Sequence, residues 1–292
     1  MSVGAQMVFF VFDLLGIVPA RRVTVFLYGS ELLRFGRSRM WRHLARRFYA
    51  RAAGFGVLTR PIERLARESG LLPPDARIVL APGALPSAFV REPTETGRDP
   101  LPGEKDGQTR ILTVARLHPR KGQLEVARTL ALLPAAQKER LVYQMVGVGE
   151  SAYRQQVEDA CREGGVRCEF LGAMDDEALG ALYRRATVYV QASVTLPNSI
   201  EGFGISFLEA SFHGCPVAAY RSGGVAEAVA DDETGLLVPE GDRAGLAAAV
   251  ARLLDDPALR ARLGEAGRTF ARGFSWEQSA RTLCEAAWHL NA

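Results

Sequence analysis

Short apolar runs alternate with helical segments from residue 110 onward, and this alternation constrains the fold more than any other feature of the chain. The runs are rich in β-branched residues and indicate βαβ units. Right-handed crossovers between such units build a doubly wound parallel sheet. A sheet of this kind binds ligands beyond the carboxyl ends of its strands, where the strand order switches. We therefore expect the chemistry in the loops that join strands to helices.

The predicted elements of this region follow one another closely. The strands are Ile111–Ala115, Leu141–Val146, Arg167–Leu171, Val188–Gln191, Pro216–Tyr220 and Gly235–Val238. The helices are Gly122–Leu133, Ala152–Glu163, Asp175–Arg185, Gly204–His213 and Val225–Val229, and further helices fill most of 242–290. Asp175 or Asp176 is placed to cap its helix.

Residues 92–110 are rich in proline, glycine and charge, and this composition predicts a linker. The predicted strands before it are Val8–Phe12, Val23–Tyr28, Gly56–Thr59 and Ile78–Ala81, with one helix at Arg37–Ala53. The apolar residues Met7–Val18 are too few to cross a bilayer and lack the features of a signal peptide. We expect a buried strand followed by a turn there.

The composition favours a soluble protein of the cytoplasm. Hydrophobic residues make up 48% and charged residues 24% of the chain, as in ordinary globular proteins. The four cysteines form no Cys-x-x-Cys pair and accompany no histidine cluster, which argues against a zinc site and a disulfide framework. The sequence contains no Asp-x-Asp motif, so we expect neither a metal nor another cofactor.

The loop after Ile111–Ala115 places Arg116 and Lys121 at the mouth of the sheet, just before a helix. Two cations beside a helix N-terminus suit a diphosphate. A solvated basic turn is the alternative. The next loop, Val146–Glu150, carries two glycines, which fit a structural turn as well as a ligand contact.

The loop that ends in the helix Gly204–His213 carries the most chemical information. Glu201 precedes this helix, Glu209 lies two turns inside it, and Gly202 and Gly204 leave backbone amides able to face an anion. Glu209 lies among apolar residues, where a carboxylate needs strong hydrogen bonds, and the two hydroxyls of a ribose would supply them. The alternative is a capping glutamate and a second one on a solvated face.

Together these motifs resemble those of family 4 of the retaining glycosyltransferases, the glycosyl transferases group 1. Glu201 and Glu209 match the E-x(7)-E signature of that family, and Arg116 and Lys121 match its phosphate-contacting residues. Other similar segments are Phe170–Gly172, Ser222–Val229, Gly235–Val238 and Phe274–Trp276. The match covers residues 111–290 in order and spacing.

The resemblance implies an α/β fold with two Rossmann-like domains of the glycosyltransferase B type, the N-terminal one incomplete. Residues 1–100 would form a partial acceptor-side domain and residues 101–273 the domain that binds the nucleotide sugar. Residues 274–292 would form a closing helix that returns toward the N-terminal domain. The opening strand and glycine-rich loop of the family have no counterpart here. A late start codon, a truncated gene and a partner that supplies the missing part are the alternatives.

The resemblance also implies a role for each matched residue. Arg116 and Lys121 would neutralise the diphosphate of the donor and help the nucleotide leave. Glu209 would hold the ribose, and Glu201 would contact the transferred sugar. The other donor-binding residues would be Gly172, Phe203, Gly204 and Ile205, and the acceptor-side residues would be Tyr28 and Gly29, with Tyr28 where the family commonly has histidine. The reaction would be retaining and metal-independent, with attack on the front face of the sugar.

The segment Arg34–Arg51 carries seven arginines and no acidic residue, with Met40, Trp41, Leu44 and Phe48 at helical spacing. Such a helix can lie peripherally on the inner face of an anionic membrane or meet a lipid-linked acceptor. It can equally be a surface helix that packs its apolar stripe into the domain. We expect no nucleic-acid partner, because no recognised binding module accompanies the charge.

The sequence thus predicts a hexosyltransferase of polysaccharide or glycolipid assembly. It would move a sugar from a nucleotide diphosphate donor to a glycan or lipid-linked acceptor. A non-catalytic nucleotide-sugar-binding module, or a subunit that needs a partner, is the alternative, and the absent opening strands favour it. A sugar-nucleotide epimerase of similar shape is a third hypothesis, against which the E-x(7)-E spacing argues.

Overall fold

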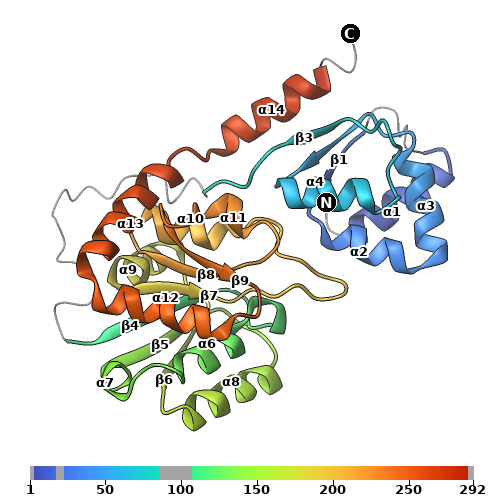
Figure 1. Cartoon of the computed structure of the whole chain (residues 1–292). Coiled ribbons are helices and arrows are strands. Elements are labelled where there is room, and N and C mark those ends of the chain that lie inside the picture. The colour runs from blue at the N-terminus through green and yellow to red at the C-terminus, as the bar shows by residue number, and fades with distance from the viewer. Residues whose placement is uncertain (1–2, 18–22, 86–106, 289–292) are drawn as a thin grey trace. The chain divides into compact units, whose positions relative to one another are not determined.

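The computed structural model of the protein describes residues 3–17, 23–85 and 107–288, which form two compact units (Figure 1). Unit 1 comprises Met1–Ala84, Thr195–Phe203 and Phe274–Ala292, and unit 2 comprises Leu85–Val194 and Gly204–Gly273. Most of the predicted linker at residues 92–110 lies outside the described residues. The two units are considered separately below.

Unit 2 contains a parallel sheet of six strands in the order β6-β5-β4-β7-β8-β9. The strands are β4 (Thr109–Val114), β5 (Leu141–Val146), β6 (Arg167–Gly172), β7 (Val188–Gln191), β8 (Val217–Arg221) and β9 (Gly235–Pro239). Each predicted strand of this region is present, with its ends shifted by no more than two residues. The prediction of a parallel, doubly wound sheet is therefore confirmed.

The helices of unit 2 alternate with these strands as predicted. They are α6 (Gln123–Leu130), α7 (Ala135–Lys138), α8 (Ser151–Glu163), α9 (Asp176–Arg185), α10 (Ile205–Phe212), α11 (Val225–Ala228), α12 (Arg243–Asp255) and α13 (Pro257–Ala271), with a 3-10 turn, η2, at Pro119–Lys121. Asp175 is the cap of α9, where its carboxylate accepts a hydrogen bond of 2.8 Å from the backbone N–H of Ala178.

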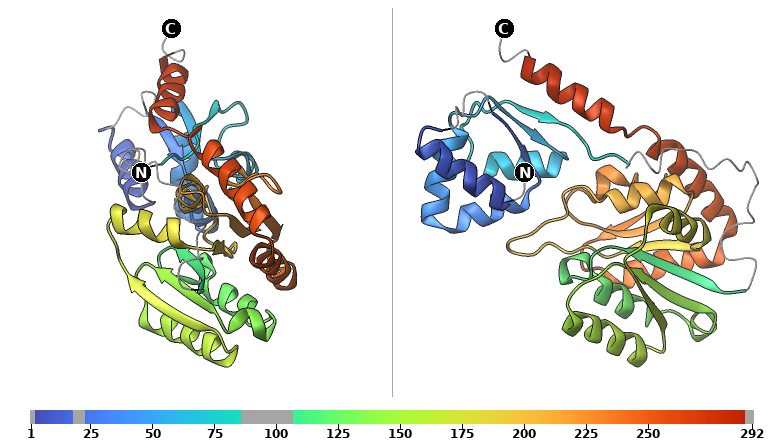
Figure 2. Two further views of the ribbon diagram at one scale, coloured as in Figure 1. Left: turned by 90° about the vertical axis from the view of Figure 1, so that its left-hand side faces the viewer. Right: turned by 180° about the vertical axis from the view of Figure 1, so that it is seen from behind.

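Alternate strand residues face opposite sides of the sheet, and both sides carry a core. One buried cluster joins the strands to α6, α8 and α12 and includes Ile111, Tyr143, Val190, Val126, Val157 and Leu246. Leu112 and Tyr189 alternate with members of this cluster and are also fully buried. The ring of Phe207 on α10 meets the ring of Tyr189 edge to face, with centroids 5.6 Å apart. Helices thus cover both faces, as a parallel sheet requires (Figure 2).

Unit 1 contains a second parallel sheet, with three strands in the order β1-β2-β3. The strands are β1 (Thr24–Leu27), β2 (Gly54–Val57) and β3 (Ile78–Leu80), and the helices are α1 (Val3–Leu14), α2 (Ser30–Arg37), α3 (Arg39–Tyr49), α4 (Arg60–Glu68) and α14 (Trp276–Trp288). The three predicted strands between residues 23 and 81 are present. In α14, the hydroxyl of Ser279 donates a 2.7 Å hydrogen bond to the carbonyl of Pro82.

The buried strand predicted at Val8–Phe12, within Met7–Val18, is wrong, because these residues belong to helix α1. The buried positions of α1 are Gln6, Phe10 and Asp13, whose spacing of four and three residues is helical rather than alternating. A short apolar run has no periodicity that separates a strand from a helix. The two polar residues that interrupt the run decide the conformation, because each finds a partner inside the unit.

The helix predicted at Arg37–Ala53 is present as α3, which is shorter at both ends, and the preceding helix α2 was not predicted. The break lies at Ser38, whose extended backbone and side-chain hydroxyl cap α3 by accepting from the N–H of Trp41. Helix α4 was not predicted, although Thr59 caps it and Pro61 stands in its first turn. Among the described residues, no helix combines the length and apolar character needed to cross a bilayer.

Candidate functional site

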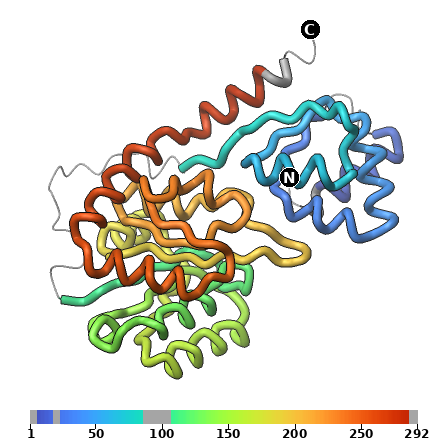
Figure 3. The backbone as a smooth tube through the Cα atoms, in the orientation of Figure 1, coloured from blue at the N-terminus to red at the C-terminus, as the bar shows by residue number. Residues whose placement is uncertain are grey.

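The strand order of unit 2 reverses at β4. From β4 the chain runs to β5 and β6 on one side, and it then returns to β7 on the other side (Figure 3). The loops that leave the carboxyl ends of β4 and β7 therefore flank the switch point at which open α/β sheets bind ligands. These loops contain Arg116, Lys121 and Gly204, so the sequence prediction and the topology select the same edge of the sheet.

The loops after β4 and β7 pack directly against each other. The N–H of Val194 donates a 2.9 Å hydrogen bond to the carbonyl of Arg120. Gly122 has φ of +74°, and a Cβ atom there would lie 1.8 Å from the carbonyl oxygen of Ala192. Only glycine fits this contact, because any side chain would meet backbone that cannot yield. Gly122 therefore holds the basic loop close to the end of β7.

The basic loop is shaped by two polar side chains. The buried Gln123 donates from Nε2 to the carbonyl of Arg116 at 3.0 Å. His118 accepts from the N–H of Arg120 through Nδ1 at 3.1 Å. Desolvation, together with the nearby charge of Arg116, holds the pKa of His118 below its ordinary value. His118 is therefore neutral at pH 7, and the positive charge of this loop comes from Arg116, Arg120 and Lys121.

The Val146–Glu150 loop has a structural role in this unit. Gly147 has φ of +134°, and a Cβ atom there would lie 2.1 Å from the carbonyl oxygen of Ala115. Its N–H donates a 2.7 Å hydrogen bond to the carbonyl of Gly172 at the end of β6. Gly147 thus lets the loop after β5 lie against the ends of β4 and β6. A Cβ atom at Gly172, whose φ is +72°, would meet no atom within 4 Å.

Helix α10 begins beside the basic loop, at the end of the segment that follows β7. Gly204, with φ of +92°, precedes it, and a Cβ atom there would lie 2.4 Å from the ring of Phe207. Because Gly204 has no side chain that could cap the helix, the first backbone N–H groups of α10, beginning at Ile205, are available to an anion. The hydroxyl of Tyr189 bonds Ser206 Oγ at 2.9 Å and fixes this first turn to β7.

Glu209 lies half-buried on α10, where its carboxylate accepts a 2.8 Å hydrogen bond from the hydroxyl of Tyr183 on α9. Burial raises the pKa of Glu209 above its ordinary value, and the bond from Tyr183 offsets part of that rise. The fully buried Tyr183 ring stacks on His213, with centroids 5.8 Å apart. Sequence reasoning did not select Tyr183. It occupies the buried face of its helix, four residues after Leu179, where a tyrosine is normally read as part of the core.

Glu201 and Phe203 lie in the part of the same segment that belongs to unit 1. This part is held by Thr59, whose hydroxyl donates a 3.0 Å hydrogen bond to the carbonyl of Gly202. Phe203 packs on Phe274, with ring centroids 5.6 Å apart. Glu201 is only 5% exposed. It does not cap α10 as the alternative supposed, because Gly204 holds that position.

Tyr28 and Gly29, the predicted acceptor-side residues, follow β1 in unit 1. The carboxylate of Glu31 accepts hydrogen bonds from the backbone N–H groups of both residues. Burial raises the pKa of Glu31, and these backbone bonds counteract the rise. A Cβ atom at Gly29, whose φ is +103°, would lie 2.5 Å from Cδ1 of Ile62. This turn thus leaves the Tyr28 side chain exposed at the carboxyl edge of the sheet.

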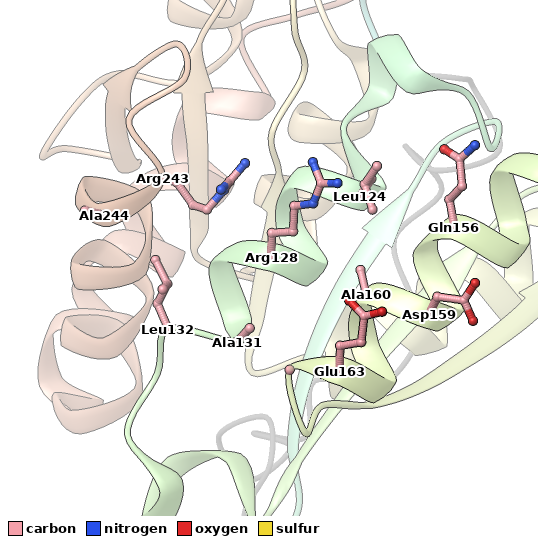
Figure 4. A pocket seen from close by; sticks show the side chains of 11 residues that line it. Leu124, Arg128, Ala131, Leu132, Gln156, Asp159, Ala160, Glu163, Arg243 and Ala244 are labelled. Atoms are coloured by element: carbon pink, nitrogen blue, oxygen red, sulfur yellow. The ribbon is translucent and has the colours of Figure 1, made fainter.

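A hollow of about 800 Å³ lies elsewhere in unit 2, between α6, α8 and the start of α12 (Figure 4). Its basic residues are Arg128 and Arg243, and both form ion pairs with Glu125. None of the predicted site residues lines it. We therefore place the candidate site at the strand ends rather than in this hollow.

Comparison with known sequences identifies related proteins. The sequence model of the family described as Glycosyl transferases group 1 matches residues 99–270. D-inositol 3-phosphate glycosyltransferase of Corynebacterium efficiens is 34% identical over 218 residues, which are 72% of this chain and 50% of the relative. Glycogen synthase of Mycobacterium tuberculosis is 31% identical over 233 residues, which are 78% of this chain and 54% of that relative. The chain spans about half the length of the curated relatives that it matches.

Solved structures agree with this relationship at the level of the fold. Sucrose-phosphate synthase from Thermosynechococcus elongatus matches with a TM-score of 0.71 at 25% identity. The match covers 91% of this chain and 67% of the synthase chain. Anabaena HepE in complex with UDP-glucose matches with a TM-score of 0.75 at 19% identity. The match covers 97% of this chain and 77% of the HepE chain. These similarities confirm the predicted α/β fold of the glycosyltransferase B type.

Proposed function

The chain belongs to the glycosyl transferases group 1 family, and on that premise we propose that it transfers a sugar from a nucleotide diphosphate donor to a glycan or lipid-linked acceptor. One observation carries the proposal more than any other. The basic loop with Arg116 and Lys121 and the uncapped start of α10 occupy the switch point of one sheet, and the carboxylate of Glu209 lies on the same helix.

In the proposed complex the diphosphate lies between the basic loop and the start of α10. Arg116 and Lys121 contribute two positive charges, and the backbone N–H groups near Gly204 and Ile205 contribute the positive end of the helix dipole. Negative charge builds on the diphosphate as its bond to the sugar breaks. These groups stabilise that charge, so we propose that they perform the work that a metal performs in other enzymes.

The nucleoside half is held on the other side of the start of α10. Glu209 accepts hydrogen bonds from the two hydroxyls of the ribose through the oxygen that Tyr183 leaves unused. Gly172 lies at the end of β6, and its open left-handed turn gives a base room to approach the backbone. The relatives do not specify the base for this chain. UDP-glucose, the ligand of the HepE structure, is the first donor to test.

Glu201 acts on the transferred sugar in this proposal, and Phe203 supports the segment that carries it by packing on Phe274. In the reaction the bond between the anomeric carbon and the diphosphate oxygen breaks. The acceptor hydroxyl oxygen bonds that carbon on the same face, and its proton passes to the departing diphosphate oxygen. Configuration is retained without an enzyme nucleophile. Tyr28 and Gly29 stand on the acceptor side.

A second function is favoured by the sheet of unit 1, in which the described residues form only three strands. A non-catalytic module, or a subunit that needs a partner, would bind the nucleotide sugar without transferring it. Both functions share the donor site and differ in turnover.

The proposed acceptor class is supported by Arg34–Arg51, whose arginines are almost all exposed and would contact an anionic membrane that carries a lipid-linked acceptor.

Two measurements on the full chain test the proposal. Calorimetry with UDP, GDP and ADP identifies a bound nucleotide, and incubation with the matching sugar donor reveals release of the nucleoside diphosphate. Binding with turnover supports the transferase. Binding without turnover, with and without lipid extracts, supports the non-catalytic module. If no nucleoside diphosphate binds, both functions are excluded.

A further inference from the structure

Helix α1 of unit 1 differs from an ordinary surface helix, because it buries two polar residues and carries apolar residues on its exposed side as well as its buried side. Its polar residues Gln6 and Asp13 are 1% and 4% exposed, whereas its apolar residues Val8, Val11 and Phe12 are exposed. A surface helix of a soluble protein normally shows the reverse arrangement. The buried side of α1 must therefore be held by specific partners, and its exposed apolar side is available to a further partner.

The inward face is held by specific contacts with α3 and with Arg51, which follows it. The hydroxyl of Tyr49 donates a 2.7 Å hydrogen bond to Oε1 of Gln6. The guanidinium of Arg51 bonds the carboxylate of Asp13. Phe10, between them, packs edge to face on Tyr49, with centroids 5.7 Å apart. Because rotation of α1 would strip a buried charge and a buried amide of these partners, the apolar residues must face outward.

The outward apolar surface continues past the end of the helix. We call it the α1 face and define it by Val8, Val11, Phe12, Leu14, Leu15 and Ile17, all of which are exposed. Leu15 and Ile17 are 64% and 62% exposed. Single exposed apolar residues are normal, but a contiguous group of six marks an interaction surface.

Positive charge borders the α1 face on the side of α3. Arg47 and Arg51 both reach Asp13 near the last turn of α1 and still expose 49% and 39% of their side chains. Helix α3 has no acidic residue, and its arginines other than Arg47 are exposed as well. An apolar face next to a basic surface matches the boundary between acyl chains and anionic headgroups.

We propose that the α1 face inserts into the surface of an anionic lipid bilayer, while the arginines of α2 and α3 contact its headgroups. The proposal rests on the membrane contact suggested above for Arg34–Arg51 and deepens it, because it names the apolar element that enters the lipid. A second copy of the chain fits this surface poorly. A symmetric dimer through the α1 face would bring the two arginine-rich surfaces together, and like charges repel.

The test uses the full chain and sedimentation with vesicles of phosphatidylcholine alone or with phosphatidylglycerol added. The key variant is Phe12→Ser with Leu15→Ser. Leu132→Ser with Trp276→Ser is the matched control, because it removes one exposed leucine and one exposed aromatic ring elsewhere. Nucleotide binding by each variant is measured separately, so a failed donor site and a failed membrane site are distinguishable.

We expect the wild type to bind anionic vesicles and the Phe12→Ser/Leu15→Ser variant to bind them at least tenfold less, with the control unchanged. Arg39→Glu, Arg42→Glu and Arg46→Glu together should abolish the preference for anionic lipid. Phe12→Trp should add tryptophan quenching by brominated acyl chains beyond that of the wild type. Equal binding by the Phe12→Ser/Leu15→Ser variant and the wild type would overturn the proposal. A wild-type dimer that becomes a monomer in that variant would also overturn it, in favour of a second copy.

Discussion

The hydroxyl of Tyr183 donates a hydrogen bond of 2.8 Å to Oε2 of Glu209, so a fully buried tyrosine on α9 orients the carboxylate on α10. The bond occupies one carboxylate oxygen and leaves the other for a ligand. Tyr183 is thus a positioning residue for the proposed ribose contact. Two contacts hold the candidate site of unit 2 in place. Tyr183 fixes the carboxylate of Glu209, and the close approach of Gly122 to Ala192 fixes the basic loop.

Replacement of Glu209 by alanine should weaken binding of the nucleoside diphosphate by about 1–3 kcal/mol, the range for loss of a charged hydrogen-bonding partner. Tyr183→Phe keeps the ring and should cost less, about 0.5–1.5 kcal/mol. Calorimetry measures both changes. Glu177→Ala, an exposed glutamate on α9, is the control and should leave binding unchanged. Wild-type affinity in the Glu209→Ala variant would exclude the ribose contact.

The raised pKa of Glu209 makes the stability of the free protein depend on pH. A carboxyl group with a raised pKa stabilises the fold while it is protonated, and this contribution is lost as the pH rises through that pKa. Glu209→Gln should therefore increase the melting temperature at pH 7, and the increase should vanish below the ordinary glutamate value of 4.5. Thermal melts from pH 4 to pH 8 test this. A decrease at pH 7 would mean that the ionised carboxylate is stabilising.

Gly122→Ala should destabilise unit 2 by about 3 kcal/mol or more, because backbone strain and a clash with Ala192 act together. Gly165→Ala is a matched control. Gly165 also has positive φ, +65°, but its Cβ would meet no atom within 4 Å, so only the left-handed strain of about 1–2 kcal/mol applies. Urea unfolding compares the two. Equal losses would show that the loops after β4 and β7 are not in close contact.

Glu201→Ala should lower the affinity for the nucleotide sugar more than the affinity for the free nucleoside diphosphate. If Glu201 contacts only the transferred sugar, its removal weakens binding of the nucleotide sugar by about 1–3 kcal/mol and leaves binding of the free nucleoside diphosphate unchanged. Calorimetry with both ligands measures the difference. Equal losses for the two ligands would assign Glu201 to the nucleotide or to the fold.

The strands of unit 2 could be predicted because their β-branched runs are bounded by clear turn residues. A parallel sheet then predicts a ligand site in the loops after its strands, where Arg116 and the start of α10 lie. Helix α1 could not be predicted, because its apolar run is decided by Gln6 and Asp13, whose partners are distant in sequence. Tyr183 was missed for a related reason. A tyrosine on a buried helix face has the same pattern whether its hydroxyl orients a carboxylate or serves only the core.

The most direct test of the central claim is the binding of a nucleoside diphosphate to the Arg116→Ala/Lys121→Ala variant in the presence of a chelator. The wild type should bind with its affinity unchanged by the chelator. Loss of two charge-assisted contacts should weaken binding by on the order of a hundredfold or more. The control Arg140→Ala/Arg162→Ala removes the same charge from exposed positions away from the site and should bind like the wild type. Equal binding by both variants, or loss of wild-type binding in the chelator, would contradict a metal-independent diphosphate site at the ends of β4 and β7.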